Sequence, residues 1–196
     1  MLNAVLALAG TQATSTNTIA PTFQISATVQ SAVRLTLATG TAATAHCTVT
    51  ATGGTPDYTM SFGTVDALAI NIPTCGSVFA PAVPGTDSAV YWSDYNLTPV
   101  FSGQAATTNT ITAKVTTNFT AADITVVRDS ANSNTVPTAA SQFTPVGTAT
   151  ADTIVTNAAN GTAVTRFIGV AVAPTNGAGT LTGSQSATVT FTLTVQ

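Results

Sequence analysis

The sequence predicts an all-β protein, an antiparallel β-sandwich of Greek-key type that carries an N-terminal extension. In several short runs apolar residues alternate with polar ones, which is the period of a strand with one buried face. Turn-forming residues separate these runs. Only residues 1–9, rich in alanine and leucine, favour a helix. The 196 residues fit one domain with an extension, and we place the extension at 1–18 and the sandwich at 19–196.

The predicted strands follow one another at short intervals. The longest alternation runs from Ile19 to Leu37 and places its apolar residues at odd positions. The segment 73–88 contains several prolines and is expected to be a loop. Shorter strands are expected at 47–50, 58–62, 89–92, 97–101, 110–117, 124–128, 153–156, 166–173 and 187–195.

The surface is expected to carry hydroxyl groups in place of charges. The chain contains 43 threonines but only four basic and seven acidic residues, and Lys114 is its single lysine. A typical soluble domain has about a quarter of its residues charged. This composition is typical of extracellular structural β-proteins, and it is unusual for enzymes and nucleic-acid binders.

The charge distribution gives no reason to expect nucleic acid as a partner. The net charge is −3, and the four basic residues are scattered instead of clustered on a phosphate-binding surface. The apolar segment 1–10 resembles a signal-peptidase site at Ala7 to Ala9, but no basic residues precede it. Because a bilayer span needs about 20 apolar residues, this segment is also too short to cross a membrane.

Cys47 and Cys75 could form a disulfide, remain two buried thiols or supply half of a metal site. Only His46 is available as an imidazole ligand, and neighbouring residues on a strand point to opposite faces. A secreted setting, suggested by the composition, favours the disulfide. It would stabilise the fold by roughly 3–4 kcal/mol in the chain-entropy model.

No pattern of catalytic residues stands out. All seven acids are aspartates, no two of them are spaced as a carboxylate pair, and no nucleophile elbow, zinc-protease or phosphate-loop motif is present. A Ser–His–Asp triad would have to use His46, and nothing marks a serine as its nucleophile. We therefore expect no enzyme, no catalytic residue, no cofactor and no metal site.

The segment 91–95 concentrates aromatic residues and has two interpretations. If it is exposed, Tyr91, Trp92 and Tyr95 could stack on sugar rings, which would make the protein a carbohydrate-binding or adhesive module. If it is buried, the same residues are packing at one end of the sandwich. We favour the second interpretation, in which these residues have only a structural role.

Unprotected strand edges are the main functional clue in the sequence. Edge strands expose unpaired backbone groups, and monomeric proteins protect them with charges, above all with lysine. This chain has almost none to place there. We therefore expect the edges to be occupied by another subunit through strand addition, which propagates head to tail. Candidate donor residues are the apolar Leu2, Ala4, Val5, Leu6 and Leu8 within 1–13.

Four segments resemble spore coat protein U and the archaic chaperone–usher pilins. They are the alternating strand 23–29 (FQISATV), the cysteine in 47–50 (CTVT), the segment 60–66 (MSFGTVD) and the final strand 187–195 (ATVTFTLTV). The resemblance implies an incomplete immunoglobulin-like fold that a neighbour's N-terminal strand completes. It also implies identical subunits as partners, a periplasmic chaperone and usher, and a filament on the cell surface with a role in adhesion. The acceptor groove would be lined by Phe23, Ile25, Val29, Val189, Phe191 and Leu193.

A surface-layer or virion protein remains an alternative, because its lattice or shell would equally keep strand edges covered. Its subunits would assemble in two dimensions or into a closed shell, whereas donor-strand subunits form a one-dimensional fibre.

Overall fold

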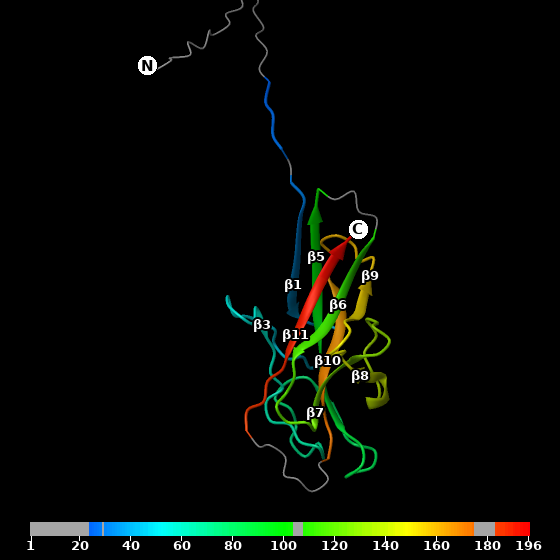
Figure 1. The fold of residues 1–196 in the computed structure, drawn as a ribbon. Coiled ribbons are helices and arrows are strands. Elements are labelled where there is room, and N and C mark those ends of the chain that lie inside the picture. Colours follow the sequence, from blue (N-terminus) through cyan, green and yellow to red (C-terminus); the bar gives the residue numbers. More distant parts are fainter. Residues whose placement is uncertain (1–23, 29, 104–107, 175–182) are drawn as a thin grey trace, which may run out of the picture. The chain divides into compact units, whose positions relative to one another are not determined.

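A computed structural model describes residues 24–28, 30–103, 108–174 and 183–196 (Figure 1). The chain divides into two units, Met1–Gln30 and Ser31–Gln196. The second unit contains every described strand, and the boundary predicted from the sequence lies after residue 18.

The described strands of Ser31–Gln196 form two main antiparallel sheets and one small one, so the predicted all-β antiparallel sandwich is confirmed. Its Greek-key, immunoglobulin-like topology stays a prediction. The first sheet has the order β1 (Ala32–Thr39), β5 (Ala89–Ser102), β10 (Val164–Val172), β7 (Ile124–Asp129) and β8 (Phe143–Pro145), with β4 (Ser77–Phe79) also paired to β5. The second has the order β11 (Thr188–Val195), β6 (Asn109–Thr117) and β9 (Asp152–Thr156), and β2 (Thr50–Ala51) pairs with β3 (Tyr58–Thr59). One 3-10 turn, η1, covers Ala140–Gln142.

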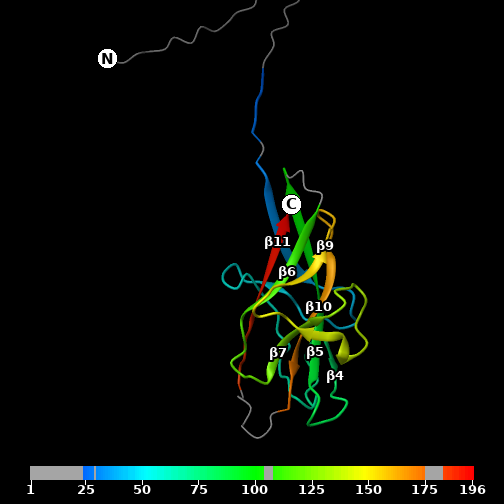
Figure 2. The ribbon, with the colours of Figure 1, turned by 45° about the vertical axis from the view of Figure 1, so that its right-hand side comes forward.

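The main core lies between the two sheets (Figure 2). The predicted alternation of β6 is confirmed, because Ile111, Ala113 and Val115 are all buried there. They meet Tyr95 and Leu97 of β5 in the same apolar cluster. The hydroxyl-rich faces of these strands are correspondingly directed away from the core.

Strand β5 differs most from expectation. We expected two short strands around a loop at 93–96, but one strand of 14 residues runs through Ser93 and Asp94. One edge of β5 pairs with β4 at residues 90–92 and with β1 at residues 95–102. Between these two stretches, the side chains of Ser93 and Asp94 accept hydrogen bonds from the segment 40–47. The Asp94 carboxylate accepts from the backbone of Ala42 at 2.6 Å and of Ala43 at 3.0 Å, and the Ser93 hydroxyl accepts from Cys47 at 2.8 Å. The crossing segment thus donates to the Ser93 hydroxyl and to one of the two Asp94 carboxylate oxygens inside the buried strand.

The predicted disulfide is confirmed: Cys47 bonds to Cys75. It ties the segment that crosses β5 to the start of β4, and Cys47 is completely buried. Two glycines permit this close packing. A Cβ at Gly76 would lie 2.5 Å from the Trp92 carbonyl oxygen, and a Cβ at Gly40 would lie 2.2 Å from the Asp94 carboxyl carbon.

Three other strand predictions need correction. The long alternation from Ile19 is not one strand, because residues 24–28 lie outside any strand and β1 begins only at Ala32. The expected loop 73–88 contains β4, and β8 was not foreseen at all. Each of these two strands has three residues, and so short a strand forms by pairing with a neighbour and not through its own alternation.

Candidate functional site

Strands β1 and β11 lie side by side at one side of the sandwich, yet they do not pair (Figure 1). β1 pairs only with β5, and β11 pairs only with β6. Each is therefore the edge strand of its own sheet, with one row of backbone groups that no other described strand bonds. We call this region the β1–β11 seam.

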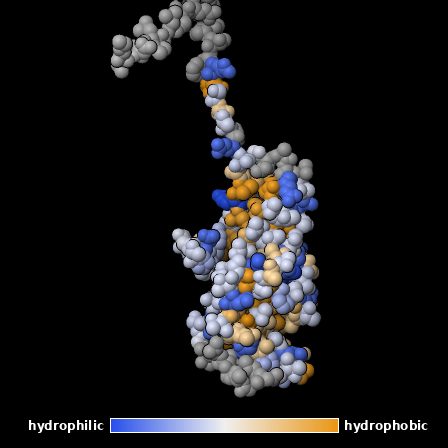
Figure 3. Space-filling view, in the orientation of Figure 1, coloured by the Kyte–Doolittle hydropathy of each residue, from blue (hydrophilic) through white to orange (hydrophobic). Residues whose placement is uncertain are grey.

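The core residues of the seam are only half-buried. Leu35 and Leu37 of β1 and Val189, Phe191 and Leu193 of β11 pack against the main core but retain exposed surface. Their partners on the neighbouring inner strands are fully buried: Leu37 lies opposite Leu97 of β5, and Leu193 lies opposite Ile111 of β6. Figure 3 shows the result as apolar surface over β1 and β11. The core is therefore open along this side.

The seam also lacks the charges that usually protect edges. β11 contains no charged residue, and β1 contains only Arg34. The single lysine, Lys114, lies on β6 opposite Thr190, in the middle strand of its sheet. Edge strands without lysine pair readily with another strand. The expectation of unprotected edges thus corresponds to one specific side of the molecule.

Side chains close the opposite side of the sandwich, at β9. Arg166 Nε donates to the Ile154 carbonyl oxygen at 2.7 Å, and Asn132 Nδ2 donates to that of Thr153 at 3.0 Å. Arg128 Nε lies 3.1 Å from Asp152 Oδ2. These contacts satisfy carbonyl groups of β9, whose only strand partner in the described chain is β6.

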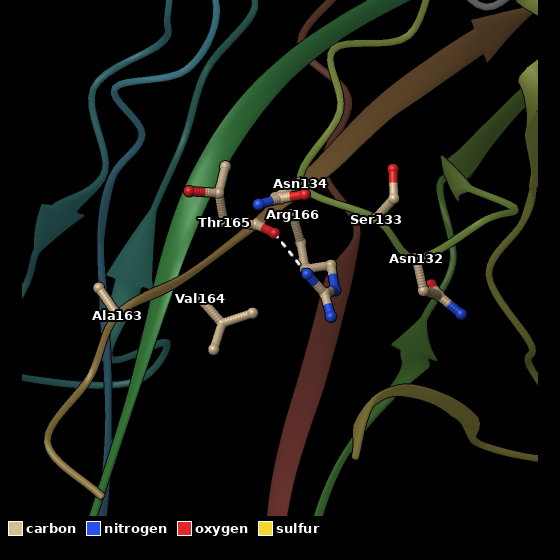
Figure 4. A pocket seen from close by; sticks show the side chains of 7 residues that line it. All are labelled: Asn132, Ser133, Asn134, Ala163, Val164, Thr165 and Arg166. Atoms are coloured by element: carbon tan, nitrogen blue, oxygen red, sulfur yellow. Dashed lines mark hydrogen bonds between the residues drawn. The ribbon is translucent and has the colours of Figure 1, made fainter. Parts of the chain in front are cut away.

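A polar hollow of about 430 Å³ lies beside this closed side, lined by residues from β10 and from the loop after β7 (Figure 4). Arg166 takes part in its wall, and its Nη1 donates to the Thr165 carbonyl oxygen at 2.7 Å. Burial lowers the pKa of the Arg166 guanidinium, and the nearby Tyr95 and Asp129 oppose that shift. The guanidinium therefore has a structural role, because it already donates hydrogen bonds to the backbone carbonyl oxygens of Ile154 and Thr165.

The structure brings together part of the predicted acceptor groove. Val189, Phe191 and Leu193 line the seam on β11, and β1 supplies Leu35 and Leu37, which the groove prediction omitted. Ile25 is 82% exposed and lies outside any strand. Phe23 and Val29 fall outside the described residues, as do all donor residues: Leu2, Ala4, Val5, Leu6 and Leu8.

Of the two interpretations of 91–95, the structure supports the favoured one, packing, and not the glycan contact. Tyr91, Trp92 and Tyr95 are all buried within β5. Trp92 stacks on Phe79 with ring centroids 5.6 Å apart and meets Phe167 edge-on at 5.8 Å. The aromatics pack on both faces of a strand that is itself covered on both faces, so they offer no sugar-stacking surface.

His46 lies beside an acid, but the pair forms no triad in the described chain. Its Nδ1 is 3.4 Å from Asp94 Oδ1. The nearby Ser93 hydroxyl accepts from Cys47 and donates to the carbonyl oxygen of Asp94 at 3.1 Å, so it is engaged with the backbone. Within the described ranges no group of three or more His, Cys, Asp and Glu side chains could hold a metal ion.

Comparisons with protein-family models, with curated proteins and with solved structures found no match to this chain. Among the residues that the structure describes, no helix is long and apolar enough to span a membrane.

Proposed function

We propose that this protein is the structural subunit of an extracellular filament, and that it polymerises head to tail by donor-strand complementation. The donor is the apolar segment 1–13 of one copy, with Leu2, Ala4, Val5, Leu6 and Leu8 as its core-facing candidates. The acceptor is the β1–β11 seam of the next copy. No enzymatic activity forms part of this proposal.

The observation that carries the proposal is the open core at the seam. Two edge strands lie next to each other, neither with a second partner among the described strands, and the residues between them are aliphatic or aromatic and half-buried. An added strand would satisfy backbone groups of these edges and would cover the seam side chains. Segment 1–13 supplies apolar residues and carries no charged side chain that the seam would have to bury.

The composition and the disulfide support an extracellular setting. A disulfide between Cys47 and Cys75 is compatible with an oxidising compartment. A surface with few charges suits a subunit whose edges are covered in the assembly. A chaperone and an usher would protect the seam before assembly, in line with the resemblance to archaic chaperone–usher pilins.

The decisive experiment removes the donor and leaves the acceptor intact. Deleting residues 1–13 should abolish filaments in negative-stain electron microscopy, because no strand remains to enter the seam. The matched point variants are Leu6→Asp within the donor and Thr16→Asp in the polar stretch that follows residue 13. We expect Leu6→Asp to prevent assembly and Thr16→Asp to leave it intact.

A synthetic peptide of residues 1–13 tests the acceptor directly. It should bind the Leu6→Asp chain and raise its melting temperature, because a ligand of the folded state stabilises that state. The further substitution Phe191→Asp should remove this shift. Ordinary fibres from the deletion variant would contradict the proposal. Flat lattices or closed shells from the wild-type chain would instead favour a surface-layer or virion protein.

A further inference from the structure

Large aliphatic side chains project from one loop of the compact unit, at 64–72 between β3 and β4. Ile72 is 85% exposed, Ile70 is 74% exposed and Leu68 is 47% exposed. Single exposed apolar residues need no explanation, but three within five positions form a patch. Such patches on ordered surfaces mark sites of association.

The loop holds this arrangement through the carboxylate of Asp66. Asp66 Oδ1 accepts from the backbone of Leu68 at 2.8 Å and of Ile70 at 3.2 Å. Asp66 Oδ2 accepts from the Asn71 backbone at 2.7 Å and from its amide Nδ2 at 2.8 Å. With its backbone bonded in this way, the loop keeps its aliphatic side chains directed into solvent.

Tyr91 anchors the loop to the sandwich. Its hydroxyl accepts from the Asp66 backbone at 3.2 Å and donates to the Asn71 carbonyl oxygen at 3.1 Å. Val65, Ala67 and Ala69 pack against the apolar cluster around Tyr91. The alternate residues therefore face inward, and Leu68, Ile70 and Ile72 are left on the outer side.

The patch lies at the opposite end of the sandwich from the point where the chain enters β1. Tyr91 is near the start of β5, whereas Ala32 pairs with Ser102 at its last residue. At about 3.3 Å per residue these ends are separated by roughly 40 Å. At the far end Val33 is 52% exposed and lies opposite the half-buried Phe101. One end thus carries the loop patch, and the other carries a smaller apolar patch at the start of β1.

We propose that the loop 64–72 binds a second copy of this chain, at the Val33–Phe101 end of that copy. The inference rests on the proposed head-to-tail assembly. In a head-to-tail assembly unlike ends of successive copies face each other, which brings the loop end of one copy toward the Val33–Phe101 end of its neighbour. The exposed Arg34 beside Val33 is complementary in charge to Asp66, the only charged residue of the loop.

Full-chain variants with one added cysteine test the contact. Val33→Cys and Ile70→Cys chains are mixed, assembled and treated with a short bismaleimide under non-reducing conditions, which keeps the native disulfide intact. We expect a cross-linked dimer from the mixture, at least tenfold more abundant than from either variant alone. Val136→Cys, on an exposed loop elsewhere, replaces Ile70→Cys as the matched control and should give no such product.

Two results would overturn the inference. One is cross-linking of Ile70→Cys chains to each other at the level of the mixture, which would indicate contact between two loops. The other is the absence of a Val33–Ile70 product in assembled material. Binding of the wild-type chain, but not of Ile70→Ser/Ile72→Ser, to neutral phospholipid vesicles without that product would assign the loop to a lipid surface.

A second readout separates this inference from the proposed function. Ile70→Ser/Ile72→Ser should shorten filaments severalfold and leave the binding of the 1–13 peptide unchanged. If filament length is unchanged and no cross-link forms, the proposed loop contact is refuted, whereas the proposed donor strand is not affected. If the 1–13 peptide does not bind the Leu6→Asp chain, donor-strand assembly is refuted, and the Val33–Ile70 cross-link still reports whether the two ends meet.

Discussion

The two sides of this sandwich are closed in different ways. At the β9 side, Ile154 and Val155 are buried, and side chains of Arg166 and Asn132 bond carbonyl groups of β9. At the β1–β11 seam the corresponding apolar residues stay half-buried, and no hydrogen bond joins β1 to β11 in the described chain. The first side is complete within one chain, whereas the second has the features of an interface that still lacks a strand.

The contrast also concerns charge. Arg128, Asp152 and Arg166 lie at the closed side, where they bond one another or the backbone. The seam has only Arg34. In a chain so poor in charged residues, placing three of them at one side leaves the other without protection against strand addition. The following predictions compare the two sides, and stabilities should be measured at one protein concentration because assembly itself stabilises the folded state.

The largest expected effect concerns the disulfide between Cys47 and Cys75, which lies in the segment that follows β1. Replacing Cys47 and Cys75 with alanine should lower the free energy of unfolding by about 3–4 kcal/mol, since the unfolded chain gains the entropy of an open loop. The segment that follows β1 is tied down by this bond, so the seam side should loosen first. Urea unfolding measures the total loss, and amide hydrogen exchange locates it. Equal loss of protection at β9 would contradict the assignment.

The second prediction compares two residues at the same register position. Ile111→Ala should cost about 2–5 kcal/mol, because it leaves a cavity in a sealed core. Leu193→Ala, directly opposite on the edge strand, should lower the free energy of unfolding by only about 1 kcal/mol, because Leu193 is only partly buried. Leu193→Ala should nevertheless weaken binding of the 1–13 peptide. Equal costs in urea unfolding would mean that the seam is as closed as the β9 side.

The third prediction compares two arginines. Arg166→Met should destabilise the protein by about 1–2 kcal/mol, because it keeps most of the side-chain bulk but leaves the Ile154 and Thr165 carbonyls without their donors. Arg34→Met should change stability by less than about 0.5 kcal/mol, because Arg34 is exposed on β1. Thermal unfolding of both variants measures the difference. A larger effect at Arg34 would show that the seam depends on its own charge.

Local patterns predicted the strands that have one solvent-facing side. β6 and β11 alternate cleanly, and their apolar faces do turn toward the core. The full length of β5 was not predicted, because its first seven residues are all buried and therefore show no alternation of apolar and polar residues. A signal was present all the same: Ser93 and Asp94 stand inside an apolar run, where buried polar groups need partners from another segment.

The seam itself could be anticipated only in part. Sequence predicts that β11 is apolar on one face and that charges are too few to protect the edges. That β1 and β11 become neighbours depends on strand order, which is set by pairings distant in sequence. The exposed patch on the loop 64–72 could not be predicted from the sequence either, because the exposure of its aliphatic residues depends on hydrogen bonds to Asp66 and Tyr91.

The smallest effect should come from pH, through the closed side. The hydrogen bond from Arg128 lowers the pKa of the Asp152 carboxyl, burial raises it, and the bond from the Gly147 backbone at 2.7 Å lowers it further, with a net decrease. A carboxyl with a depressed folded-state pKa contributes stability that is fully present above its unfolded pKa, near 3.8. That stability is lost as the pH falls through the folded value.

Asp152→Asn should therefore lower the free energy of unfolding by about 1 kcal/mol at pH 7. The difference in the free energy of unfolding between the variant and the wild type should shrink as the pH falls below about 4. The pKa of Asp66 is lowered as well, because the bonds from Asn71, Ile70 and Leu68 outweigh the effect of burial. Asp66 is present in both proteins, however, so its titration cancels in the difference. Urea unfolding at a series of pH values from 7 down to well below 3.8 measures the difference in the free energy of unfolding between the two proteins. A difference that does not narrow anywhere in this range would mean that the ionised carboxylate does not hold the closed side, and that the two sides differ in apolar packing alone.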